Sequence, residues 1–387
     1  MRNPLKLEKS LELRKGQNAL RSLKVPNGLR DFSSNDYLGL AASPAIFAQT
    51  TQLLEEFKLR NNGSTGSRLL CGNHELFPVT EAFLSKFHKA PASLIFNSGY
   101  DANVGFFSSI PQRGDIVFYD ALIHASIRDG ILMGNARALK FAHNDLSDLK
   151  EKINRVRQQL NLEAVDIFIV TESVFSMDGD SPPLETLCRL AEEQNCFLVI
   201  DEAHAVGIFG ERGAGLISQL GLEEKVFARI VTFGKALGTH GAMILGSEKL
   251  IEYLVNFARS FIYTTALPPH AVASILAVYQ YMENSTEFLC AIDQLEENIS
   301  HFREEIKQWK VNTNFIESES AIQCCIVPGN EQARFMASKL QEKGYDVRPI
   351  LSPTVLKGSE RLRICLHSFN TSDEIKGLVK LMATFIK

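Results

Sequence analysis

The chain has 387 residues and a formal net charge of -4, with 45% hydrophobic and 22% charged residues. This composition is typical of a globular protein, and the length predicts one large domain with a smaller one. The negative charge argues against nucleic-acid binding through a broad basic surface, and no apolar run approaches the roughly 18 residues of a membrane-spanning helix, so neither nucleic acid nor membrane is an expected partner.

Along the chain, short apolar runs alternate with longer segments of helical period. Leu13, Gln17 and Leu20 share one helical face and predict an N-terminal helix lying on the body. Helices are expected at 44–60, 75–88, 146–160 and 184–194. Strands are expected at 94–96, 116–119, 166–171, 197–201, 230–233 and 242–245. This alternation predicts an α/β fold, with a mostly parallel central sheet flanked by helices.

The pattern changes after about residue 268. A long helical stretch is expected to about residue 309, followed by a strand at 322–327, a helix near 333–343, a strand at 362–365 and a last helix. Thr371 and Glu374 form a capping box for that helix. We therefore expect a smaller α+β domain at 269–387, after an N-terminal segment at 1–43 and a large domain at 44–268.

The seven cysteines are odd in number and form no CxxC pair. This pattern favours a reducing compartment over a disulfide framework or a zinc site, so no metal is expected. The N-terminus is rich in Lys and Arg, but Glu8 and Glu12 interrupt it, which argues against a transit peptide. The expected location is the cytoplasm.

The apolar run 197–200 leads into Asp201 and, three residues later, His204. Ligands of open α/β sheets lie beyond the carboxyl ends of the strands, which makes both residues candidates for a binding site. The same letters, DEAH, occur in helicases, but nucleotide hydrolysis would need a GxxxxGK[ST] loop, and the only Gly-Lys pair is followed by Ala236. A carboxylate that merely caps a turn is the simpler alternative.

Lys235 follows the next predicted strand and stands between Gly234 and Gly238. A lysine that forms a Schiff base must approach a flat ring closely and react as the neutral amine, which a desolvated site promotes. Pyridoxal 5′-phosphate (PLP) needs such a lysine and a carboxylate at its pyridine nitrogen. Lys235 and Asp201 supply both groups, so PLP is the predicted cofactor.

Three further polar clusters follow predicted strands, and each also has an ordinary structural explanation. Gly99 opens a strand–glycine–helix junction that suits an anion. His124 is a candidate to stack on a ring, and Ser176 lies in an acidic turn near the same edge. Thr232, three residues before Lys235, is a candidate phosphate contact.

Several motifs in order resemble the α-oxoamine synthases, which are PLP-dependent acyl-CoA:amino acid acyltransferases of aminotransferase fold type I. The likeness covers nearly the whole chain. Its motifs are the clusters above together with NDYLGL (35–40), GSTGSRLL (63–70), RPILSPT (348–354) and RLR (361–363). Ala205 departs from the pattern, since the family commonly has glycine there, and this bears on the exact substrate more than on the class.

The resemblance implies roles in holding the cofactor. Lys235 would bond to PLP and later move a proton, and Asp201 would pair with the pyridinium nitrogen. The remaining cofactor contacts are expected from His124 on the ring face, Ser176 and His204 at the ring hydroxyl, and Gly99, Tyr100 and Thr232 at the phosphate. Thr265 would reach the phosphate in a neighbouring subunit, because the family builds its sites at a homodimer interface.

The resemblance also implies the substrates, an amino acid and an acyl thioester carried by CoA or an acyl carrier protein. Arg363 would bind the amino-acid carboxylate with Asn35 nearby, and Arg21 and Thr354 match substrate-contacting positions. The likeness is strongest to the member that joins L-alanine to a pimeloyl thioester. Activities with glycine or serine stay open, namely 2-amino-3-ketobutyrate CoA ligase, 5-aminolevulinate synthase and serine palmitoyltransferase. A non-catalytic partner subunit is the alternative from another class, and the presence of Lys235 counts against it.

Overall fold

The computed structural model describes residues 3–17, 20, 23, 28–159 and 165–386. The chain divides into two units, Met1–Arg30 and Asp31–Lys387. The first unit contains helix α1 (Leu5–Gly16), which buries no side chain. An N-terminal helix is therefore present as predicted, but it ends before Leu20, so the face predicted from Leu13, Gln17 and Leu20 does not form.

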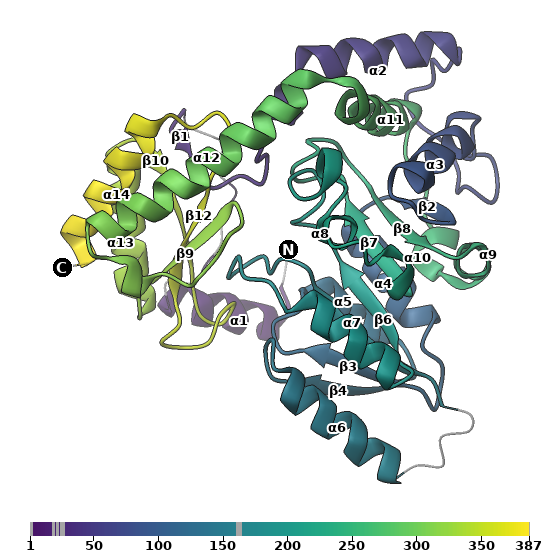
Figure 1. The fold of residues 1–387 in the computed structure, drawn as a ribbon, viewed down its shortest axis with the longest axis horizontal. Helices are drawn as coiled ribbons and strands as arrows, with labels where there is room; N and C mark the ends of the chain where they lie inside the picture. Colours follow the sequence, from purple (N-terminus) through teal and green to yellow (C-terminus); the bar gives the residue numbers. More distant parts are fainter. Residues whose placement is uncertain (1–2, 18–19, 21–22, 24–27, 160–164, 387) are drawn as a thin grey trace. The chain divides into compact units, whose positions relative to one another are not determined.

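The main sheet of the second unit has seven strands among the described residues, in the order β2-β8-β7-β6-β5-β3-β4 (Figure 1). The strands are β2 (Ala92–Phe96), β3 (Ile116–Asp120), β4 (Arg137–Phe141), β5 (Ile167–Glu172), β6 (Phe197–Asp201), β7 (Ala228–Thr232) and β8 (Ala242–Gly246). Strands β3 to β7 run parallel, and β8 runs antiparallel to both β7 and β2. The predicted mostly parallel sheet is confirmed.

Helices cover both faces of this sheet, because its strands are apolar on both sides. Along β5, Ile167 and Ile169 join one apolar cluster, while Phe168 and Val170 join the other. The first cluster is completed by α6 (Leu146–Gln159) and α7 (Leu184–Glu193). The second is completed by α4 (Gly99–Ser109), α5 (Ala125–Met133), α9 (Glu248–Phe257) and α10 (Arg259–Ile262).

The C-terminal part has its own antiparallel sheet, in the order β11-β12-β9, drawn in green and yellow in Figure 1. Its elements are β9 (Ile322–Ile326), α13 (Asn330–Glu342), β10 (Tyr345–Asp346), β11 (Arg348–Ile350), β12 (Arg361–Cys365) and α14 (Ser372–Ile386). The capping box of α14 is confirmed: the Thr371 amide donates to Glu374 Oε2 (3.0 Å), and the Glu374 amide donates to Thr371 Oγ1 (3.3 Å).

A third apolar cluster joins this sheet to the helices that border the main sheet. It contains residues of α2 (Pro44–Glu56), α3 (Leu76–Phe87), α11 (Pro269–Asn284) and α12 (Thr286–Gln308). The expected single helical stretch is two helices, because Ser285 adopts extended backbone between them and its hydroxyl accepts from the Phe288 amide at the start of α12. The shared core makes the two sheets parts of one compact unit.

The remaining elements are short. They are the strand β1 (Arg30–Asp31), the helix α8 (Leu216–Gln219) and 3₁₀ turns at Leu40–Ala42, Glu211–Gly213, Glu223–Lys225 and Asn312–Asn314. No helix within the described ranges is long and apolar enough to cross a membrane.

Candidate active site

The two residues on which the sequence argument rests leave neighbouring parallel strands at the same edge of the sheet. Asp201 is the last residue of β6 and is in register with Ile230 of β7, and Lys235 follows the end of β7 by three residues. Asp201 is 5% exposed, and its two carboxylate oxygens accept hydrogen bonds from the Ala203 amide (2.9 Å) and from Asn103 Nδ2 (2.9 Å). The carboxylate is therefore held in place within a buried setting.

Lys235 is half-buried, and its Nζ forms a hydrogen bond with His204 Nε2. Desolvation lowers the pKa of the Lys235 ammonium to about 8, although the charges of Asp201 and Glu172 act in the opposite direction. The amine is thus readily deprotonated near neutral pH, as a Schiff-base lysine requires.

The glycine three residues after Lys235 is required at its position for steric reasons. Gly238 has a φ of 62°, and a Cβ there would lie 2.2 Å from the Ala41 amide nitrogen. The turn after Lys235 therefore packs backbone against backbone on the segment that follows the NDYLGL motif, which only glycine permits.

Asn103 connects Asp201 to the loop that carries His124. Its Nδ2 also donates to Ser126 Oγ (3.0 Å), which lies 2.7 Å from His124 Nδ1. The imidazole of His124 is exposed and caps the N-terminus of α5 by accepting from the Ser126 amide. The position of the predicted ring-stacking histidine is thus tied to that of the predicted ring-nitrogen partner.

Glu172 ends β5 beside Asp201 and holds two loops of the site. It accepts from the His124 amide (2.6 Å) and from the Ser176 amide. Burial, reinforced by the charge of Asp201, raises the pKa of the Glu172 carboxyl to about 8. The sequence alone assigned no role to Glu172 or Asn103. Glu172 could be noticed only because it ends a predicted strand, and Asn103 only because it lies one helical turn after Gly99.

The predicted phosphate contacts gather at the start of α4. Gly99 and Tyr100 are the first residues of the helix, and a Cβ at Gly99 would lie 3.5 Å from Thr232 Oγ1. Unpaired amides at the N-terminus of a helix attract anions, so this corner suits a phosphate. The hydroxyl of Tyr100 donates to Asp129 Oδ2 (2.7 Å).

The predicted substrate residue Arg363 lies on β12 and is 8% exposed. Its Nη2 donates to Asn35 Oδ1 (2.9 Å) and its Nε donates to the Ser176 carbonyl (2.7 Å). The structure therefore joins Arg363, Asn35 and Ser176, which come from three distant parts of the chain.

Three other predicted residues are not joined to this group by the described contacts. Thr265 is exposed, and its carbonyl accepts from Asn97 Nδ2 (2.7 Å). Thr354 is exposed in the loop after β11, where its amide donates to the Leu351 carbonyl (2.8 Å). Arg21 lies outside the described residues.

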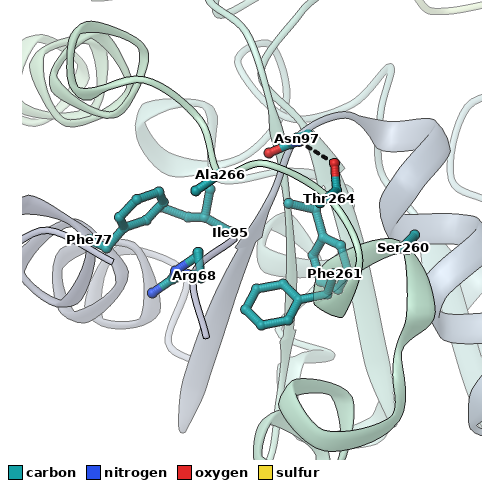
Figure 2. Close-up of a pocket in the computed structure, with 9 residues that line it drawn as sticks. Arg68, Phe77, Ile95, Asn97, Ser260, Phe261, Thr264 and Ala266 are labelled. Atoms are coloured by element: carbon teal, nitrogen blue, oxygen red, sulfur yellow. Dashed lines mark hydrogen bonds between the residues drawn. The ribbon is translucent and has the colours of Figure 1, made fainter. Parts of the chain in front are cut away.

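A narrow pocket adjoins the segment that carries Thr265. Figure 2 shows Asn97 bonded to Thr264 on one side of it and Arg68 on the other. The guanidinium of Arg68, from the GSTGSRLL motif, lies 4.0 Å from the centroid of the Phe77 ring and pairs with Glu81. Since Glu81 also accepts from the Ile95 amide of β2 (2.9 Å), Arg68 braces the sheet edge beside this pocket.

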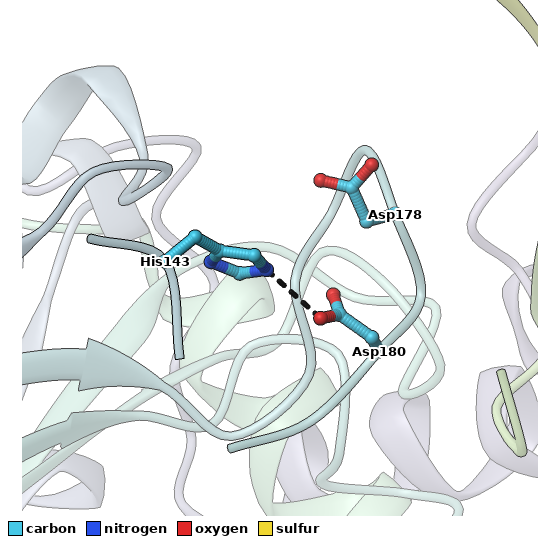
Figure 3. A group of neighbouring side chains, drawn as sticks. All are labelled: His143, Asp178 and Asp180. Atoms are coloured by element: carbon cyan, nitrogen blue, oxygen red, sulfur yellow. Dashed lines mark hydrogen bonds and ion pairs between the residues drawn. The ribbon is translucent and has the colours of Figure 1, made fainter. Parts of the chain in front are cut away.

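His143, Asp178 and Asp180 form a second cluster of polar side chains (Figure 3). The imidazole lies between Asp120 (2.9 Å) and Asp180 (2.8 Å), while Asp178 pairs with Arg361. Burial alone would lower the pKa of His143, but the two carboxylates outweigh it and raise the pKa to about 9. In the described structure His143 therefore forms an ionic contact with Asp120 and Asp180.

The site fits PLP on its own geometry. A buried carboxylate, a lysine of lowered pKa and an anion-binding helix start meet at the carboxyl edge of one sheet. Residues 28–380 match the family model "Aminotransferase class I and II". The chain belongs to this family.

Within that class, curated proteins similar to this chain include 8-amino-7-oxononanoate synthases. The synthase of Emericella nidulans is 41% identical over 98% of this chain and 95% of its own length. A putative synthase of Halalkalibacterium halodurans is 39% identical over 90% of this chain and 84% of its own.

Solved structures of two related enzymes share the fold. Serine palmitoyltransferase from S. paucimobilis, solved with PLP and myriocin, has a TM-score of 0.86 at 26% identity and covers 98% of this chain and 96% of its own. The 8-amino-7-oxononanoate synthase of Francisella tularensis has a TM-score of 0.76 at 28% identity and covers 93% of this chain and 98% of its own. The aminotransferase fold type I predicted from the sequence is thereby confirmed.

Proposed function

We propose that the protein is a PLP-dependent 8-amino-7-oxononanoate synthase of biotin biosynthesis. It condenses L-alanine with a pimeloyl thioester, on CoA or on a carrier protein, and releases 8-amino-7-oxononanoate, CO2 and the free thiol. The observation that carries this proposal is the meeting of Asp201 and Lys235 at neighbouring strand ends, in a chain 34–41% identical to proteins that bear this name.

Bound PLP supplies an electron sink for the negative charge that develops at the amino-acid Cα. Lys235 would hold it covalently, Asp201 would keep its ring nitrogen protonated, and His204 and Ser176 would face its ring hydroxyl. His124 would lie against the ring, and Gly99, Tyr100 and Thr232 would bind its phosphate.

The chain's own groups then position the substrate and move its proton. Arg363 is oriented by Asn35 and Ser176, and it binds the alanine carboxylate through its remaining N–H groups. The Lys235 amine removes the proton from the alanine Cα, and its lowered pKa of about 8 keeps it suited to this at neutral pH.

The choice of alanine over other amino acids rests on the relatives. Curated proteins named 8-amino-7-oxononanoate synthase reach 41% identity over nearly the whole chain. The solved structures do not separate the two activities, since the serine palmitoyltransferases are 26–28% identical and the Francisella tularensis synthase is 28% identical. Glycine- and serine-using enzymes of the family share the same lysine, aspartate and histidine, so the substrate must be tested directly.

Two features of this function remain predictions. A homodimer with shared sites would bring Thr265 of one subunit to the phosphate site of the other. Cytoplasmic location rests on the cysteine pattern of the sequence. Analytical ultracentrifugation of the holoenzyme tests the first of these.

The cofactor assignment is tested by absorption spectroscopy. The purified protein should show a visible band with PLP that borohydride shifts, and peptide mapping should find the reduced adduct on Lys235. A protein that stays colourless with PLP, or an adduct on another lysine, would contradict the assignment.

The substrate assignment needs a competition among amino acids. With pimeloyl-CoA and pimeloyl-carrier protein as donors, L-alanine should give far faster release of CO2 and thiol than glycine or L-serine. A strong preference for glycine or serine would still agree with an α-oxoamine synthase, but it would contradict the assignment as an 8-amino-7-oxononanoate synthase.

A further inference from the structure

A chain of hydrogen bonds links the predicted carboxylate-binding arginine to the predicted cofactor lysine. Arg363 Nη2 donates to Asn35 Oδ1 (2.9 Å), and the hydroxyl of Tyr37 lies 3.1 Å from the same oxygen. The Tyr37 oxygen is also 2.8 Å from His204 Nδ1, and His204 Nε2 bonds to Lys235. Tyr37 is the middle member, and it has no role in the mechanism given above.

The chemistry of the groups at the two ends fixes the direction of this chain. Lys235 as an ammonium only donates, so His204 Nε2 must accept and the single proton of the neutral ring must be on Nδ1. That Nδ1–H then donates to the Tyr37 oxygen, whose own hydrogen goes to Asn35 Oδ1. Asn35 Oδ1 has two lone pairs and can accept from both Tyr37 and Arg363, so every donor has an acceptor.

Because these groups are buried, losing one of their hydrogen bonds would cost free energy. Tyr37 is 0% and His204 is 3% exposed. Desolvation, with the charges of Lys235 and Arg363, lowers the pKa of His204 well below its usual value, so the ring carries one proton and not two. In the described contacts, the partner of His204 Nδ1 is the Tyr37 hydroxyl, which can donate or accept.

A second buried histidine–tyrosine pair provides a natural comparison. His88 Nε2 lies 2.9 Å from the hydroxyl of Tyr279, but its Nδ1 lies 3.2 Å from the Ala214 carbonyl. A carbonyl only accepts, so it fixes the proton of His88 on Nδ1 whatever Tyr279 does. His204 has no such carbonyl among its described contacts. The Lys235 ammonium holds the His204 proton on Nδ1 only while it is charged, so once Lys235 is neutral or bonded to PLP the tautomer depends on Tyr37.

We propose that Tyr37 is a positioning residue that fixes the orientation and tautomer of His204, so that the Nε2 lone pair faces Lys235 and the ring of PLP. The part of this inference that concerns PLP rests on the proposed function. The part that concerns the His204 proton is a property of the chain itself and can be tested without cofactor.

The direct test is ¹⁵N NMR of the histidine rings in the cofactor-free, full-length protein at about pH 9, above the Lys235 pKa of about 8, where the neutral amine no longer requires Nε2 to accept. The His204 signals are assigned by their absence in His204→Ala. In the wild type, Nδ1 should be protonated and Nε2 unprotonated. In Tyr37→Phe the Nδ1–H loses its acceptor, so the two nitrogen shifts of His204 should move toward each other.

The matched control is Tyr279→Phe, which removes the same hydroxyl from an equally buried pair. It should leave His88 protonated on Nδ1 and His204 unchanged. Unchanged His204 shifts in Tyr37→Phe would overturn the proposal, as would an equal movement of the His204 shifts in Tyr279→Phe.

A second readout uses the protein loaded with PLP. Tyr37→Phe should shift the pH midpoint of the visible band by about one pH unit, and in the His204→Ala background it should add nothing. A shift of equal size in both backgrounds would show that Tyr37 does not act through His204 and would overturn the proposal. A wild-type protein that binds no PLP would contradict the proposed function instead, while the NMR result would still decide the role of Tyr37.

Discussion

The carboxylate of Asp201 accepts a hydrogen bond of 2.9 Å from Asn103, which comes from the helix that begins at the predicted phosphate site. Asn103 also holds Ser126, and through it His124. The buried amide of Asn103 therefore connects three parts of the predicted cofactor site. These are Asp201 at the ring nitrogen, His124 on the ring face and the start of α4 at the phosphate.

This relationship predicts the effect of Asn103→Ala. The change leaves an oxygen of Asp201 without its donor and frees Ser126, so PLP should bind at least about tenfold more weakly, in line with 1–3 kcal/mol for an unsatisfied buried group. Asn298→Ala is the control, because Asn298 is also buried and donates to two carbonyls, those of His367 and Asn370. Both variants should unfold at lower denaturant, but only Asn103→Ala should change the PLP affinity measured by fluorescence titration.

Lys235→Ala should remove the reactive amine without disturbing the fold. We expect the visible band of the lysine-bound cofactor to disappear and kcat to fall by about three orders of magnitude or more, since the group that both binds and moves a proton is lost. Lys225→Ala is the control, because Lys225 is exposed and pairs only with Glu192 in the described contacts. A coloured and fully active Lys235→Ala protein would refute the assignment.

Arg363 and Arg361 lie two residues apart on β12 and are predicted to differ in role. Arg363→Lys loses the fork of N–H groups, so the KM for L-alanine should rise by about tenfold to a hundredfold with a smaller change in kcat. Arg361 pairs with buried Asp178, so Arg361→Lys should lower stability while leaving KM near its wild-type value. Steady-state kinetics and urea denaturation of both variants separate the two roles, and an unchanged KM in Arg363→Lys would exclude the carboxylate role.

The sequence revealed the strands that are buried on both faces and missed those that are not. β6 was placed to the residue because 197–201 is a continuous apolar run that ends in a carboxylate. β4 was missed because most of its residues are exposed, and no apolar run marks an edge strand of this kind. β11, with three half-buried residues, was missed for the same reason.

The same limit applies to the site. Asp201 and Lys235 could be predicted because the carboxyl ends of adjacent strands converge, which local pattern alone indicates. Tyr37, Asn103 and Glu172 could not, because each acts through a partner far away in the chain, such as His204, which is 167 residues from Tyr37. Long-range hydrogen bonds of this kind leave no periodic signal in a single sequence.

The cluster of His143 with Asp120 and Asp180 predicts how stability depends on pH. The pKa of His143 is raised to about 9 in the folded protein, against about 6.5 for an unperturbed histidine. The folded state therefore binds a proton more tightly than the unfolded state between these values. The stabilisation is fully present below pH 6.5, is lost as the pH rises toward 9, and amounts to about 3 kcal/mol at most.

His143→Gln removes this titration while keeping a side chain that can hydrogen-bond. The wild type should lose stability between about pH 6.5 and 9 by up to about 3 kcal/mol, whereas the free energy of unfolding of the variant should change much less over this range. Urea denaturation at several pH values measures the difference. Because the variant leaves the fully buried Asp120 without its cationic partner, it should also be less stable than the wild type at pH 6.5. Parallel pH profiles for the two proteins would mean that His143 is neutral in the folded state and that its contacts with both carboxylates are ordinary hydrogen bonds.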